Sequence, residues 1–124
     1  MNKIEEKILE LALKQTPSVE VLYEEGETRS VSFENNKLKY VNTKSIRGIG
    51  LRVIKDGRIG FSSTTDFRKF EKLVANAIES AEFGQVAAFD FPSKNNFPKV
   101  AVLDQRIIDY PINKCVDIGK EAIE

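Results

Sequence analysis

Apolar residues recur along the chain at two spacings, and the change of spacing divides it into predicted elements. Ile4, Ile8 and Leu11 follow a helical spacing with charged residues between them, which predicts an amphipathic helix over roughly residues 2–15. A second helical stripe runs from Phe67 to about residue 82. A third follows Pro111, a residue favoured in a first helical turn, and continues to the end of the chain.

Between the first two helical stripes the period is two, which is typical of half-buried strands. Alternating residues predict about five strands, over roughly 19–23, 31–34, 38–41, 47–55 and 58–63. The apolar run 99–103 offers a further short strand, whereas prolines and asparagines make residues 83–98 a predicted loop. We therefore expect a single α+β domain over residues 1–124, mainly an antiparallel meander sheet with helices packed on one face.

Two short segments predict tight hairpins in this sheet. Asn35-Asn36 and Asp56-Gly57 both tolerate the positive φ angles of a two-residue type I′ turn. The first turn predicts that Glu34 and Lys37 face each other as an ion pair. The second makes residues pair when their numbers sum to 113, so that Gly50 faces Ser63 and Val53 faces Gly60.

The absence of histidine narrows the chemistry of this chain most strongly. It excludes a Ser-His-Asp or Cys-His pair within the sequence. The single cysteine, Cys115, permits no internal disulfide and cannot make a zinc site by itself. We expect no cofactor in this chain. No apolar run is long enough to cross a membrane and the acidic N-terminus is not a secretory signal, so we expect a cytoplasmic protein.

Charge is unevenly distributed although the net charge is zero. Residues 37–72 contain 10 basic and 3 acidic side chains, a net charge of +7. One interpretation is a solvated sheet face that neutralises acidic helices nearby. The alternative is a stand-alone module that binds anions or nucleic acid through this basic segment.

The segment from Gly48 to Asp66 is rich in glycine, but it matches no phosphate-binding loop, because it lacks the Gly-Lys-Ser/Thr sequence and a helix directly after the glycines. Glycines inside strands often mark a bend or a close approach by another backbone. They either leave room for a helix packed over the sheet or form a strip on which a peptide strand could lie. The candidate peptide or interface surface consists of Arg47, Gly48, Gly50, Arg52, Gly57, Arg58 and Gly60, together with Phe89 and Phe91 of the loop.

The segment SIRGIGLRVIKDGRIGFSSTTDF, from Ser45 to Phe67, resembles the N-terminal signature of the TldD/PmbA family. The upstream VEVLY and SVSFENNKLKYV and the downstream ANAIESAE also fit this pattern. The resemblance covers roughly residues 1–85 well. It implies the N-terminal domain of a metallopeptidase, or of its partner subunit, that acts on unfolded or leader peptides; members were also named modulators of DNA gyrase.

The same resemblance implies what this chain lacks. The family's metal-binding motif, His-Glu-x-x-x-His with a later cysteine, belongs to a C-terminal half, and no position of this sequence matches it. Zinc is therefore expected only in that C-terminal domain. The last helical stripe has no stop signal before Glu124, so we expect an N-terminal fragment of a longer chain. The implied partners are its own C-terminal domain, a second subunit in a homo- or heterodimer and a peptide substrate, but no membrane or nucleic acid.

Overall fold

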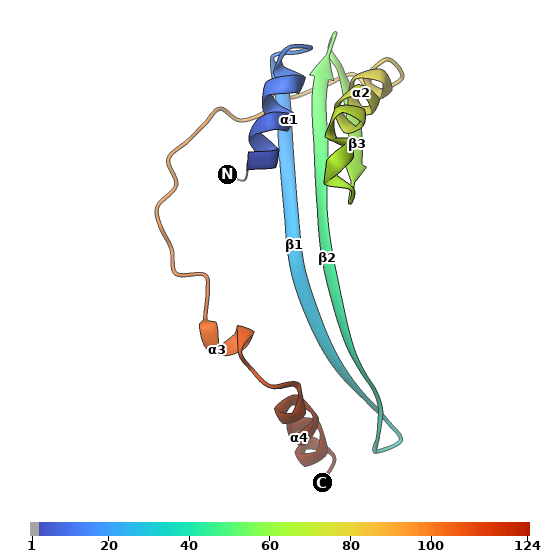
Figure 1. Ribbon diagram of the computed structural model, residues 1–124, viewed down its shortest axis with the longest axis vertical. Coiled ribbons are helices and arrows are strands. Elements are labelled where there is room, and N and C mark those ends of the chain that lie inside the picture. The colour runs from blue at the N-terminus through green and yellow to red at the C-terminus, as the bar shows by residue number, and fades with distance from the viewer. Residues whose placement is uncertain (1–2) are drawn as a thin grey trace. The chain divides into compact units, whose positions relative to one another are not determined.

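The computed structural model describes residues 3–124 (Figure 1). The elements are α1 (Lys3–Leu13), β1 (Ser18–Glu34), β2 (Lys37–Lys55), β3 (Arg58–Thr64), the 3₁₀ helix η1 (Phe67–Lys69), α2 (Phe70–Ala81), α3 (Gln105–Ile108) and α4 (Ile112–Ile123). The strands form one antiparallel sheet in the order β1-β2-β3. The described residues divide into two compact units, one of residues 3–26 and 46–94 and the other of residues 27–45 and 95–124.

The α+β class and the antiparallel sheet are confirmed, but the described residues form three strands in place of about five. Glu25-Gly26-Glu27, expected as a turn, continues within β1, and Gly26 does not adopt a positive φ. Residues 42–46, expected to separate two strands, continue within β2. Residues 99–103 form no strand. Two long paired strands thus replace four short ones.

Both predicted hairpin turns are confirmed. Asn35 and Asn36 have φ of 51° and 60°, and Asp56 and Gly57 have φ of 50° and 72°, as type I′ turns require. The predicted register of the second hairpin is also confirmed, because Gly50 pairs with Ser63 and Val53 with Gly60. The ion pair predicted at the first turn is wrong: the carboxylate of Glu34 pairs with Lys39 and not with Lys37.

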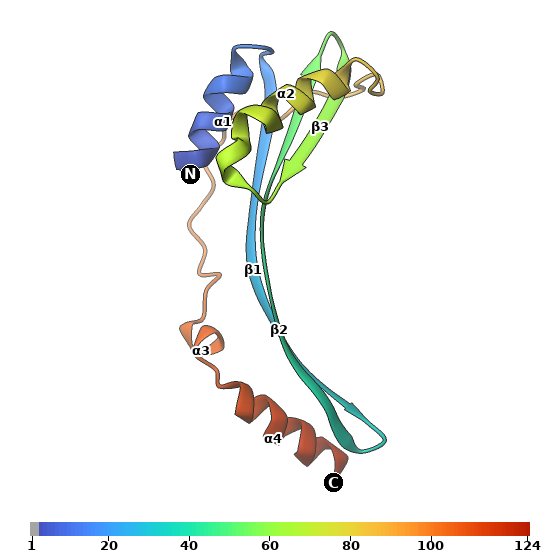
Figure 2. The ribbon, with the colours of Figure 1, turned by 45° about the vertical axis from the view of Figure 1, so that its right-hand side comes forward.

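The first unit contains the hydrophobic core. Helices α1 and α2 both cover one face of the sheet, which we call the inner face (Figure 2). Alternate residues of β2 from Ile49 to Val53 enter this layer, and the core consists of Ile8, Ala12, Ile49, Leu51, Val53, Leu73, Val74, Ala77 and Ala81. The expectation of helices on one sheet face therefore holds for this unit.

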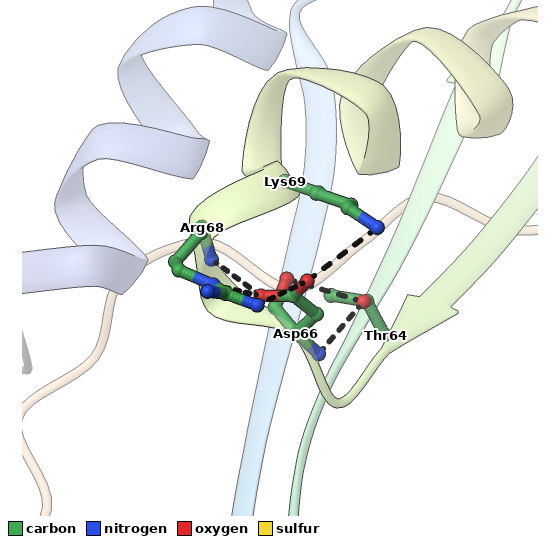
Figure 3. Close-up of polar contacts among 4 residues, drawn as sticks. All are labelled: Thr64, Asp66, Arg68 and Lys69. Carbon is green, nitrogen blue, oxygen red and sulfur yellow. Dashed lines mark hydrogen bonds and ion pairs between the residues drawn. The ribbon is translucent and has the colours of Figure 1, made fainter.

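Asp66 follows strand β3 and is the N-cap residue of the 3₁₀ helix η1 (Figure 3). Its side chain accepts a hydrogen bond from the backbone N–H of Arg68 at 3.2 Å, as an N-cap residue does. It also binds the Arg68 side chain at 2.9 Å and lies 3.6 Å from the ammonium of Lys69. The hydrogen bond from the Arg68 side chain is the main reason that the pKa of Asp66 falls from 3.8 to about 2.

The second unit is built differently, because it contains none of the buried core residues. Within it, Phe33 packs against Gly119 of α4 so closely that a Cβ atom on Gly119 would lie 2.1 Å from the ring. Arg29 donates to the backbone carbonyls of Tyr110 at 2.5 Å and Ile107 at 2.7 Å. The hydrogen bonds of Arg29 and the contact between Phe33 and Gly119 thus hold this unit together.

Candidate functional site

The glycines of the predicted strip lie on opposite faces of the sheet. Directly paired residues of an antiparallel sheet share a face, so Gly60 lies with buried Val53 on the inner face. A Cβ atom on Gly60 would lie 2.0 Å from the carbonyl oxygen of Ala77 in α2. Close approach of a helix therefore requires glycine at position 60, and this residue cannot belong to a peptide-binding strip.

Gly48 and Gly50 lie on the other face, which we call the outer face. A Cβ atom on Gly50 would meet its nearest neighbour, the Phe61 ring, at 3.5 Å, and one on Gly48 would meet the Thr64 carbonyl at 3.6 Å. Both distances are ordinary van der Waals contacts, and neither glycine has a positive φ. Neither packing nor backbone conformation requires glycine at these two positions.

The outer face contains an open hollow of about 940 Å³ above these two glycines. Leu22 of β1 and Phe61 of β3 stand at its sides with 64% and 59% of their surfaces exposed. Acidic, basic and hydroxyl side chains complete the lining, which includes Glu20, Glu24, Arg52, Ser63, Thr64 and Thr65. The hollow thus combines a floor without side chains, exposed apolar walls and a few polar groups.

Arg52 forms one wall of this hollow and already has partners on two sides. Its Nε and one terminal nitrogen lie 2.9 Å and 2.6 Å from the same carboxylate oxygen of Glu20. The rings of Phe89 and Phe91 lie over the guanidinium, with centroids at 5.4 Å and 5.0 Å. This arrangement attaches the segment after α2 to the outer face through cation–π contacts.

The same segment covers much of the free edge of β3. The N–H of Ile59 donates to the carbonyl of Gln85 at 2.9 Å, and the N–H of Ala87 donates to the carbonyl of Gly57 at 2.8 Å. The hydroxyl of Ser80 accepts from the N–H of Phe61 at 2.8 Å. Residues 57–61 are therefore closed to an added strand, which protects this edge.

The other predicted site residues lie away from the hollow. Arg47 places its guanidinium 4.5 Å from the ring centroid of Phe67. Gly57 is the second residue of the hairpin turn, and Arg58 donates to the carbonyl of Gly84 at 2.7 Å. The structure thus brings Gly48, Gly50, Arg52, Phe89 and Phe91 together around one side of the outer face, without Arg47, Gly57, Arg58 and Gly60.

Sequence reasoning missed several lining residues, among them Glu20, Leu22, Glu24 and Phe61. The alternation of β1 contained a signal for three of them, because Glu20, Leu22 and Glu24 alternate with Val19, Val21 and Tyr23, which pack toward the core. Phe61 could have been found from the hairpin register, since it pairs with Arg52.

The basic segment 37–72 contains cations that have acidic partners within the structure. Its residues belong to both compact units. Several of its cations have acidic partners: Arg52 pairs with Glu20, and both Arg68 and Lys69 pair with Asp66. These ion pairs favour the interpretation of local neutralisation, while nucleic-acid binding stays a prediction.

Among the residues that the structure describes, no cluster of side chains fits a metal site. Within residues 3–124, no group of three or more histidine, cysteine, aspartate or glutamate side chains could hold an ion. Cys115 is half-buried and unpaired, and the sequence contains no histidine. Among the described helices, none combines the length and the apolar character needed to cross a bilayer.

Comparison with known proteins identifies the scaffold that carries this hollow. A family model described as PmbA/TldA metallopeptidase domain 1 matches residues 19–81, from the start of β1 to the end of α2. The chain belongs to the PmbA/TldD family. The match contains all three strands of the sheet and the lining of the hollow. The resemblance seen in the sequence is thereby confirmed.

A curated relative and several solved structures are also similar to this chain. An uncharacterised protein of Methanocaldococcus jannaschii is 29% identical over 112 residues, which cover 90% of this chain and 26% of that protein. The crystal structure of TldE from Thermococcus kodakarensis has a TM-score of 0.82 at 16% identity, over 95% of this chain and 28% of that one. A proposed modulator of a DNA gyrase from Thermotoga maritima has a TM-score of 0.73 at 23% identity, over 97% and 28% of the two chains. The PmbA/TldD chain described here thus spans about a quarter of the length of these proteins.

Proposed function

We propose that this chain serves as the non-catalytic N-terminal domain of a longer PmbA/TldD-type zinc metallopeptidase, or of its partner subunit, that acts on unfolded or leader peptides. The observation that carries the proposal is the match of residues 19–81 to domain 1 of a metallopeptidase family. The coverage of about a quarter of each relative supports a longer parent protein. In such a protein the metal ligands come from another domain, because the residues of this one do not fit zinc.

In this proposal the domain has a structural and a guiding role. The inner face of the sheet is used for the core, which makes the first unit a stable scaffold. The outer face keeps its hollow open, which supports a role in contacting a peptide or a neighbouring subunit. We expect a cytoplasmic protein that works as a dimer.

The reading frame beyond Glu124 tests the proposal. A frame that continues and encodes His-Glu-x-x-x-His supports a peptidase domain, whereas a frame that continues without this motif supports a silent partner subunit. A stop codon directly after Glu124 would contradict the proposal. In parallel, the purified chain with added zinc should not hydrolyse an unfolded peptide, and hydrolysis by the chain alone would also contradict it.

A further inference from the structure

We infer that the hollow on the outer face is a docking site for an extended polypeptide segment that combines apolar side chains with a lysine or arginine. The inference deepens the proposed guiding role and rests on it. Three features of the first unit lead to it: two glycines that the fold does not need, apolar walls that remain exposed, and a local charge that is negative and incompletely paired.

The glycines are the first step. Glycine in a strand interior is typically less stable than alanine by about 0.5–1 kcal/mol, and at Gly60 the proximity of α2 explains why the chain nevertheless has it. No such contact explains Gly48 or Gly50, whose Cβ atoms would have ordinary neighbours. Side chains at these two positions would, however, fill the floor of the hollow. Their absence thus preserves its depth.

The walls are the second step. Leu22 and Phe61 stand beside this floor and leave most of their surfaces exposed. Ser63 follows the covered part of the β3 edge. Within residues 3–124, its backbone N–H has no hydrogen-bond partner like those of Ile59 and Phe61. An extended segment could place apolar side chains between Leu22 and Phe61 and use the main chain of Ser63.

Charge is the third step and defines the class of partner. Glu20 and Glu24 face the hollow opposite a single cation, Arg52. Arg52 already forms an ion pair with Glu20 and lies under the rings of Phe89 and Phe91, so its positive charge is offset before a ligand binds. No ion pair involves Glu24 in the described part of the chain, and its carboxylate is available to a cationic side chain. The complementary segment is therefore apolar and basic.

Fluorescence anisotropy with three labelled synthetic peptides tests this inference on the intact chain. The probes are Gly-Leu-Lys-Leu-Lys-Gly, its glutamate counterpart Gly-Leu-Glu-Leu-Glu-Gly and the non-apolar Gly-Ser-Lys-Ser-Lys-Gly. We expect saturable binding of the first peptide only, weakened by salt. Equal or tighter binding of the glutamate peptide, or of single-stranded DNA, would overturn the inference and favour an anion-binding module.

Two substitutions connect binding to the hollow. Gly50→Val should fill the floor and weaken binding by about tenfold or more, while circular dichroism and the melting temperature show an intact fold, since valine suits a strand. Glu24→Gln should weaken binding of the lysine peptide roughly two- to fivefold, as an exposed ion pair allows. Glu71→Gln, which changes an exposed glutamate of α2 outside the hollow lining, is the matched control and should have no effect.

The docking inference can fail while the proposed function holds, and the reverse. If the folded chain binds none of the peptides, or if Gly50→Val binds as well as the original chain, the docking inference fails. The assignment to the N-terminal domain of a longer protein would then remain, because it depends on the reading frame after Glu124. A stop codon there together with peptide binding would instead leave the hollow as a binding site of a stand-alone module.

Discussion

On the inner face of the β2–β3 hairpin, the residue opposite Val53 is a glycine because α2 leaves no room for a side chain. On the outer face, the residue opposite Ser63 is also a glycine, although there is room for a side chain. The comparison shows that the same residue type in one hairpin can serve packing on one face and keep a surface open on the other. The following predictions test this difference.

The largest effect should come from shortening an apolar side chain on each face. Leu51 is fully buried on the inner face, and Leu51→Ala should lower the free energy of unfolding by about 2–5 kcal/mol, because it removes buried surface and leaves a cavity. Leu22 stands exposed on the outer face, and Leu22→Ala should change it by less than about 0.5 kcal/mol. Chemical denaturation of both variants measures the difference. Equal losses would show that the outer face is packed as well.

A smaller effect is expected for the rings that lie on Arg52. Replacing Phe89 and Phe91 together by serine should cost about 1 kcal/mol, since cation–π contacts at exposed sites are modest. Phe83→Ser is a suitable control because that ring is 87% exposed. The melting temperatures of the double variant and of the control show whether the two rings attach this segment to the sheet. A double variant as stable as the control would contradict the attachment.

The smallest effect concerns pH and the N-cap of the helical segment. The pKa of Asp66 is lowered from 3.8 to about 2, so its ionised form stabilises the fold above about pH 4. This contribution should be lost as the pH falls from 3.8 to about 2, where the folded protein also takes up the proton. Asp66→Asn should therefore flatten the decline of stability in this range, compared with Asp90→Asn as a control. Parallel slopes for the original chain and Asp66→Asn would rule out the role assigned to this carboxylate.

The sequence allowed the β2–β3 hairpin to be predicted because its signals are local. Asp56-Gly57 determines the turn type, and the turn determines the pairing of Gly50 and Gly60. Continuity of β1 through Gly26 could not be predicted, because turn-forming residues remain extended there within a long paired strand.

The candidate site was predicted in part for the same reason. Gly48, Gly50 and Arg52 alternate with core residues of β2, so their common face follows from the period of two. The contact of Arg52 with Phe89 and Phe91 joins residues far apart in the sequence across an irregular segment. No local pattern encodes such a contact. The assignment of Gly60 to the same strip was wrong because the register that was correctly predicted already places it on the inner face.

Equilibrium denaturation of Gly60→Ala and Gly50→Ala, measured side by side, tests the difference between the two faces most directly. The account predicts that Gly60→Ala lowers the free energy of unfolding by about 1–3 kcal/mol or more, because the new Cβ atom must displace the backbone of α2. It predicts that Gly50→Ala leaves the free energy unchanged or raises it by up to about 1 kcal/mol. Similar losses for both variants would contradict the claim that only the inner face requires its glycine.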